Sequence, residues 1–260
     1  MGRLPRWLVA TAFVVYVFLH APIAVLIAFS FNASKFSVNW VGFTWAWYRR
    51  LLERDDILHG LRTSLIVGAA ATVLSTVFGT LLALGLARHR SRGRTLLEAL
   101  LYAPIVTPEI VVGISLLLLF VLLGVPLGLA TITIAHVAFC LPFVAVVVAA
   151  RLQGMDRHLE EAAMTLGADE LAAFRRVTLP QLWPGILAGA LLAFTMSFDD
   201  FVITSFVSGA GSSTLPIVVY GMVRRTIEPS INAISTIILV GTAILLYLAE
   251  RLLRREPEAA

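Results

Sequence analysis

Three carboxylate side chains lie inside long apolar stretches of this sequence, where ionisable groups are rare. They belong to Glu109 and to the adjacent pair Asp199 and Asp200. An acidic residue near the centre of a membrane costs roughly 2.5 to 3.5 kcal/mol, so each one needs a reason. Carboxylates that face a transient aqueous cavity attract ammonium groups, which makes a pathway for cations one reason. The alternative is structural: the carboxylates cap helices, or pair with Arg224, Arg225 or a partner subunit.

Other groups capable of chemistry are few. Adjacent aspartates on a helix point about 100° apart, so both cannot face one pore centre, although one can orient its neighbour. His136 is alone in its apolar run, which favours a hydrogen-bonded packing histidine over a proton relay. Cys140 is the single cysteine and is read as a small packed residue. Neither a metal site nor a catalytic centre is expected, because no cluster has ligand spacing and no nucleophile motif is present.

The composition is that of a membrane protein. Of 260 residues, 59% are hydrophobic and 14% are charged, with a mean hydropathy of +0.90; soluble domains carry roughly 25% charge. The pI near 9.7 raises the question of nucleic acid. The basic residues are scattered in short clusters between apolar runs, so a nucleic-acid surface is not expected and the lipid bilayer is the expected surroundings. The sequence therefore predicts an all-α membrane protein.

Six spanning helices are expected, because a helix needs about 20 largely apolar residues to cross a bilayer. They cover about residues 7–31, 63–87, 99–123, 129–150, 183–207 and 231–250. The first apolar stretch is longer than the core of a signal peptide, so it is kept as a helix. The third must begin near Ala99, which draws Glu109 into the membrane beside Pro104 and Pro108, where the helix would kink or break.

The start of the fifth span is open. Pro180 and Pro184 favour a start near Trp183, which places both aspartates in the second half of the helix. A helix over the uncharged stretch 177–198 would leave them at the outer surface instead.

The basic residues also predict the orientation of the chain. Of the 20 Lys and Arg residues, seven fall on one side of the expected spans: Lys35, Arg49, Arg50, Arg54, Arg62, Arg224 and Arg225. The other thirteen fall on the opposite side, which is then cytoplasmic because basic residues concentrate in cytoplasmic loops. Both termini should be cytoplasmic, and residues 32–60 and 208–230 should form external loops.

The longest cytoplasmic connection, residues 151–182, predicts two short helices joined by a bend. Asp156 can cap the first helix, Gly167 can end it, and Asp169 can cap the second. In the first helix an apolar face repeats at i, i+3, i+4 and i+7: Leu159, Ala162, Ala163 and Leu166. Glu160 and Glu161 begin its polar side. Small residues on an exposed helix face allow close approach of another protein, but a loop lying on the membrane surface has the same composition.

This connection resembles the EAA motif of ATP-binding cassette (ABC) importer permeases. The matching residues are Glu161, Ala162, Ala163, Gly167, Val177, Leu179 and Pro180, with valine at the position where the motif has isoleucine. The resemblance implies the type I ABC importer permease fold, in which the first helix of the motif couples to a cytosolic ATPase. Glu161 would then contact the ATPase. It also implies that this chain is not an enzyme and has no cofactor, because ATP and Mg²⁺ are bound by the partner ATPase.

A second resemblance extends over most of the chain and is to the spermidine and putrescine permeases. It rests on the runs PEIVVGISLLLL from residue 108, LEEAAMTLGA from 159 and SFDDFVITSFVSGAGSSTLP from 197. The resemblance implies polyamine import across the bacterial cytoplasmic (inner) membrane. The partners it implies are a second, homologous but different permease, two ATPase subunits and an external substrate-binding protein seated near residues 32–60.

Two alternatives stay open at this point. Related permeases for other small solutes share much of the pattern, so the solute could differ. An ion-coupled secondary transporter would also suit acidic residues in the membrane. Six spans without a visible inverted repeat argue against such a carrier.

Overall fold

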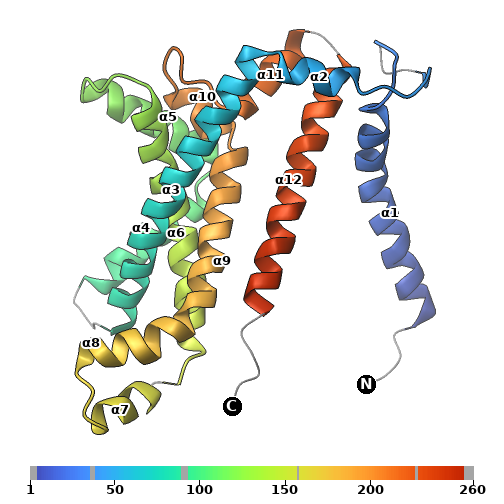
Figure 1. Ribbon diagram of the computed structural model, residues 1–260. Coiled ribbons are helices and arrows are strands. Elements are labelled where there is room, and N and C mark those ends of the chain that lie inside the picture. Colours follow the sequence, from blue (N-terminus) through green and yellow to red (C-terminus); the bar gives the residue numbers. More distant parts are fainter. Residues whose placement is uncertain (1–4, 36–38, 89–92, 157, 226–227, 255–260) are drawn as a thin grey trace. The chain divides into compact units, whose positions relative to one another are not determined.

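The computed structural model describes residues 5–35, 39–88, 93–156, 158–225 and 228–254 (Figure 1). These ranges form helices joined by short loops, with one isolated antiparallel bridge between Asn32 and Phe43. The helices are α1 (Arg6–Phe29), α2 (Ala46–Leu52), α3 (Asp55–Arg88), α4 (Arg94–Val106), α5 (Glu109–Leu122), α6 (Leu129–Gln153), α7 (His158–Thr165), α8 (Glu170–Ala173), the π-helical turn η1 (Phe174–Thr178), α9 (Leu179–Asp199), α10 (Val202–Val207), α11 (Leu215–Arg225) and α12 (Pro229–Arg254). Among the basic residues that predict the orientation, Arg3, Arg90, Arg92, Arg157 and Arg255 lie outside the described ranges.

Five helices in the described part of the chain are long and apolar enough to cross a membrane. They are α1, α3, α6, α12 and the helix that runs from Glu170 through η1 to Asp199. The pair α4 and α5 makes a sixth candidate if it counts as one bent span. The segments expected to be external also contain helix, since α2 lies within residues 32–60 and α11 within 208–230.

The third span differs from the continuous helix expected over residues 99–123. α4 and α5 are bent by 112° at a break between Val106 and Glu109. Thr107 adopts an extended conformation with ψ of 132°. This follows from Pro108, because a proline disfavours the helical conformation of the residue before it and has no N–H to donate.

The fifth span starts earlier than either sequence alternative. The helix already begins at Glu170 and passes through η1, where the N–H of Leu179 bonds to the carbonyl of Phe174, five residues back. The wider π turn lies directly before Pro180, which has no N–H to continue the ordinary ladder. The helix ends at Asp199, since Asp200 is extended with ψ of 124°, and α10 then begins at Val202.

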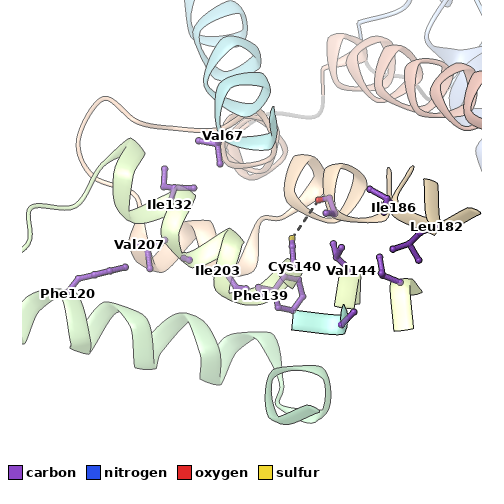
Figure 2. Close-up of a cluster of buried hydrophobic side chains, with 14 residues drawn as sticks. Val67, Phe120, Ile132, Phe139, Cys140, Val144, Leu182, Ile186, Ile203 and Val207 are labelled. Carbon is purple, nitrogen blue, oxygen red and sulfur yellow. Dashed lines mark hydrogen bonds between the residues drawn. The ribbon is translucent and has the colours of Figure 1, made fainter. Parts of the chain in front are cut away.

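The chain divides into two compact units: residues Met1–Leu58 with Val218–Ala243, and residues His59–Ile217 with Ile244–Ala260. In the second unit α6 is central and packs against α4, α5, α9 and α10. Its core of buried side chains includes Ile132, Phe139 and Val144 from α6 (Figure 2). Cys140 is fully buried there, with its Sγ 3.6 Å from the carbonyl of Ala193, so it is the packed residue that the sequence predicts.

Small residues let the helices of this unit approach closely. A Cβ added at Gly79 of α3 would lie 2.9 Å from the Val144 Cβ, and one at Gly189 of α9 would lie 3.1 Å from the Val144 Cγ1. Gly113 of α5 similarly approaches Phe206 of α10. Helices in membranes associate through this kind of packing, because lipid provides little hydrophobic drive.

In the first unit, the segment after α1 is held by the side chain and backbone of Asn32. Its Nδ2 donates to the Asn39 carbonyl at 2.7 Å, and its Oδ1 accepts from the Val41 N–H at 2.9 Å. Trp47 Nε1 donates to the Asn32 carbonyl at 2.7 Å. The neighbouring Phe31 ring contacts the rings of Phe43, Trp45 and Tyr48. This part of the expected external loop is therefore ordered by its own contacts.

Candidate functional site

The segment 151–182 has the predicted helix, bend and helix. The Asp156 carboxylate accepts the N–H of His158 at 2.9 Å at the start of α7. After α7, Gly167 has a φ of +94°, a conformation that favours glycine. Asp169 then caps α8, accepting the Ala172 N–H at 2.6 Å. The bend is thus made by residue types suited to it, and it folds α7 back against α8 and η1.

α7 presents an apolar face and one carboxylate to its surroundings. Leu166 is 89% exposed, and Leu159 and Ala162 on the same face are exposed beside it. Ala163 is half-buried. The Glu161 side chain is 67% exposed, and its nearest charged neighbour is His158, 3.4 Å away in the same helix. Glu161 and Ala162 of the motif, together with Leu159 and Leu166, thus form a surface that the described part of the chain leaves open.

The neighbouring carboxylate, Glu160, is instead held within the chain. The Arg88 Nη2 at the end of α3 lies 2.7 and 2.8 Å from its two oxygens. Thr178 Oγ1, on η1, donates to Glu160 Oε2 at 2.9 Å. The sequence places Glu160 only on the polar side of the first cytoplasmic helix, because Arg88 is 72 residues away and only the fold brings the two side chains together.

The last two motif residues begin α9. Leu179 is partly buried against the hydrophobic core, whereas Pro180 is exposed. Pro180 follows the wider π turn η1, which accommodates its missing N–H within the continuous helix. These residues therefore contribute to the junction between the segment and the fifth span, 12 or more residues after Gly167.

The adjacent aspartates have different surroundings. Asp199, the last residue of α9, is exposed and makes no hydrogen bond or ion pair with the described residues. Asp200 is buried: its carboxylate accepts the N–H of Thr204 at 2.8 Å and that of Ile203 at 3.2 Å, at the start of α10. Asp200 thus caps a helix, and Asp199 is the carboxylate left open to a ligand.

His136 completes the buried polar cluster around Asp200. Its Nδ1 hydrogen-bonds with Ser197 Oγ at 2.7 Å, and its Nε2 lies 2.9 Å from Thr204 Oγ1 and 3.2 Å from Asp200 Oδ2. Because Thr204 donates its hydroxyl proton to Asp200 at 2.7 Å, the proton between His136 and Thr204 belongs to Nε2. The prediction of a hydrogen-bonded packing histidine is confirmed; its partners, Ser197 and Thr204, were not foreseen from the sequence.

Glu109 lies at the other helix break. It is the exposed first residue of α5, directly after Pro108. A carboxylate in the first turn of a helix is stabilised by the helix dipole. Within the described residues it contacts neither aspartate, so the three acidic residues do not form one cluster, and no group of three or more His, Cys, Asp or Glu there could hold a metal.

Comparison with known proteins shows the family to which the sequence is related. Residues 75–256 match the family "Binding-protein-dependent transport system inner membrane component". The spermidine/putrescine transport system permease protein PotC of Escherichia coli K12 is 41% identical over 256 residues, covering 98% of this chain and 96% of that protein. The putrescine transport system permease protein PotI of the same organism is 42% identical over 266 residues, covering 98% and 95%.

Among solved structures, a bacterial ABC transporter involved in the import of the acidic polysaccharide alginate has a similar chain. The match has a TM-score of 0.75 at 15% identity and covers 97% of this chain and 96% of that one. The expected all-α fold of ABC importer permeases is confirmed, as is a multi-pass protein of the cytoplasmic membrane. The family match covers most of the chain and the relatives cover nearly all of it, so this protein belongs to the inner-membrane permease components of binding-protein-dependent transport systems, close to the spermidine and putrescine permeases.

Proposed function

We propose that this chain is a membrane subunit of an ABC importer that moves polyamines such as spermidine and putrescine into the cell. The permease alternates between inward-facing and outward-facing states, and a cytosolic ATPase drives the change. The chain itself catalyses no reaction and has no cofactor, since ATP and Mg²⁺ are bound by the ATPase.

The observation that carries the proposal is the exposed face of α7. Glu161 and Leu166 are exposed, while Glu160, on the same helix, is engaged within the chain. A carboxylate beside exposed apolar side chains is suited to an ATPase groove that supplies an arginine and apolar contacts. Ala162, Ala163 and Gly167 keep the backbone accessible for close approach, and Leu179 and Pro180 join the docking helix to the fifth span.

The polyamine substrate is supported by the two relatives named above and by the acidic residues in the apolar segments. Asp199 and Glu109 each expose a carboxylate at a helix break, where a cationic solute can be met without a fixed internal partner. Asp200, although part of the same proposed pathway, supports α10 instead of facing a ligand. A similar fold serves an importer of an acidic polysaccharide, so the fold alone does not choose the solute.

The proposed assembly contains a second, homologous but different permease, two ATPase subunits and an external substrate-binding protein. The basic-residue bias supports cytoplasmic termini and a cytoplasmic α7. The binding protein would then lie on the opposite side, near residues 32–60. Their exposed aromatic side chains, Trp40, Phe43 and Trp45, supply contact area.

The ATPase contact is tested by co-purification of the complete complex carrying Glu161→Ala. We expect the apparent affinity for the ATPase to fall by about tenfold or more, as when one partner of an interfacial charge pair is removed. Glu98→Ala is the matched control, because Glu98 is also a half-exposed carboxylate near a helix start but pairs with Arg94 of its own helix. Equal ATPase recovery for wild type and Glu161→Ala would refute the docking role.

The substrate role is tested separately by uptake of labelled spermidine and putrescine into vesicles holding the complex. Asp199→Asn should abolish most uptake while the complex stays assembled, because a neutral amide no longer attracts ammonium groups. Glu98→Gln is the control, since Glu98 is a partly exposed carboxylate that pairs with Arg94 of its own helix and belongs to no proposed contact. Uptake that is unchanged in Asp199→Asn would remove this residue from the pathway. If only another class of solute were taken up and stimulated ATP hydrolysis, the polyamine assignment would be wrong.

A further inference from the structure

Arg88, Glu160 and Thr178 join three segments that are distant in sequence. Arg88 ends the membrane helix α3, Glu160 lies in α7, and Thr178 ends the turn η1. The guanidinium of Arg88 reaches both oxygens of Glu160, at 2.7 and 2.8 Å, and Thr178 Oγ1 donates to Oε2 at 2.9 Å. In the sequence, Glu160 is 72 residues from Arg88 and 18 residues from Thr178, so these contacts exist only in the folded chain.

The three side chains are held from several directions. Thr178 is 4% exposed and the Glu160 side chain 25% exposed, so the carboxylate is largely shielded from water. The Arg88 guanidinium also lies over the ring of Phe174, 5.6 Å from its centroid. Exposed ion pairs contribute little on their own, but an arginine that binds a shielded carboxylate through both oxygens has a defined geometry.

This group connects α7 to α3, a connection that the backbone does not provide. α7 is joined covalently to α6 and α8, and it packs against α8 and η1. The Arg88–Glu160 pair is the link to α3 that the structure shows. Adjacent residues on a helix point about 100° apart, so Glu161 can face a partner protein while Glu160 faces the membrane helices of its own chain.

We infer that Arg88, Glu160 and Thr178 are positioning residues that make α7 and α3 move together, so that a displacement of α7 by the ATPase reaches the membrane helices. This rests on the proposed function, in which α7 binds the ATPase. Loss of the pair leaves the docking face of α7 intact but lets α7 move without α3. ATP hydrolysis then continues with less transport for each ATP consumed.

The test measures polyamine uptake and ATP hydrolysis together in the complete reconstituted complex. For Arg88→Ala and Glu160→Ala we expect normal ATPase recovery and a ratio of transported polyamine to hydrolysed ATP that falls about fivefold or more. The double variant Arg88→Glu with Glu160→Arg should recover a large part of the ratio, because the ion pair forms again in reverse. Arg88→Lys should retain only part of the ratio, since lysine lacks the planar guanidinium that lies over the Phe174 ring while one of its nitrogens binds Glu160.

The matched control is the pair Arg94–Glu98, whose atoms are also 2.7 Å apart but which joins two residues of α4. Arg94→Ala and Glu98→Ala should leave the ratio unchanged, because this pair connects no separate segments. The inference would be overturned if Arg88→Ala and Glu160→Ala left the ratio of transported polyamine to hydrolysed ATP unchanged. It would also be overturned if the Arg94 and Glu98 variants lowered this ratio as much as the Arg88 and Glu160 variants do. Loss of ATPase recovery in Glu160→Ala would also overturn it, because the residue would then act in docking.

A second measurement does not depend on the identity of the solute. Spin labels on Leu81 of α3 and Met164 of α7, both exposed, report the separation of the helices in a Cys140→Ser background. The wild-type distance distribution should stay narrow through the nucleotide cycle, and that of Glu160→Ala should broaden. Identical distributions would contradict the inference, whereas a wild-type complex that recruits no ATPase would contradict the proposed function instead.

Discussion

The neighbouring residues Asp199 and Asp200 have different surroundings, because Asp199 ends α9 at an exposed position and Asp200 lies in a buried polar cluster. Asp200 accepts two backbone N–H groups of α10 and contacts His136 and Thr204. Asp199 is exposed at the end of α9. Its substitution is therefore expected to affect ligand contact, and substitution of Asp200 to affect stability.

Asp200→Ala should lower the stability of the solubilised protein by roughly 2 to 4 kcal/mol. The change removes a helix cap, worth about 0.5 to 2 kcal/mol, and takes the carboxylate acceptor away from the buried Thr204 hydroxyl, at about 1 to 3 kcal/mol. Thermal unfolding in detergent measures the effect. Asp199→Ala is the control and should unfold near the wild-type temperature; similar destabilisation by both substitutions would show that the two sites are not distinct.

This division between the aspartates was only partly predictable. The angle between adjacent helical residues indicates that they cannot face the same point, and capping was among the alternatives that the sequence left open. The partner that buries Asp200 is His136, 64 residues earlier, and no local pattern links them. The sequence likewise does not show which of Glu160 and Glu161 pairs with Arg88, because that depends on the position of the end of α3 in the folded chain.

At the scale of the helices, the approach of α3 to α6 depends on Gly79. A Cβ at this position would meet the Val144 Cβ at 2.9 Å and the Leu141 carbonyl oxygen at 3.1 Å. Gly79→Ala should therefore destabilise the protein by about 1 to 3 kcal/mol, because a packed backbone must shift to admit the methyl group. Resistance to thermal unfolding in detergent measures this change.

Gly85→Ala, in the same helix, is the matched control. Nothing lies within 4 Å of a Cβ at Gly85, so only helix propensity acts, and alanine should be neutral or stabilise by up to about 1 kcal/mol. If Gly79→Ala and Gly85→Ala both changed the stability in the same direction, close packing of α3 on α6 would not be the reason for glycine at position 79.

The bend after α7 makes a second prediction at this scale. Gly167 has a φ of +94°, so Gly167→Ala strains the backbone by roughly 1 to 2 kcal/mol. Limited proteolysis of the solubilised complex should cut the segment 151–182 faster in this variant. Gly154→Ala should behave like wild type, because Gly154 has a φ of −85° that alanine adopts freely; faster cleavage in both variants would refute the role of the left-handed bend.

The sequence predicts the number and type of the spanning helices better than it predicts where these helices break. Apolar length locates α1, α3, α6 and α12, because a bilayer requires it. Prolines indicate a kink in the third span, but the 112° angle depends on how α5 packs against α10. The fifth helix extends back to Glu170 through a π turn, which is a local adjustment before Pro180 that apolar periodicity does not report.

At the scale of the whole molecule, the composition and one motif carried most of the functional inference. High hydropathy requires a membrane, and the motif of residues 161–180 predicts a partner-binding helix on a membrane protein in which no catalytic centre is expected. An importer driven by ATP and a carrier driven by an ion gradient share those membrane features. They differ in what powers transport, so the energy source decides between them.

The most direct test is uptake of labelled spermidine by sealed vesicles that hold the complete complex with its binding protein. Uptake should require ATP on the ATPase side and persist when ionophores collapse the ion gradients. It should also be lost in Glu161→Ala, while Glu98→Ala transports like wild type. Uptake that proceeds without ATP and stops when the gradients collapse would contradict the account and identify the chain as part of an ion-coupled carrier.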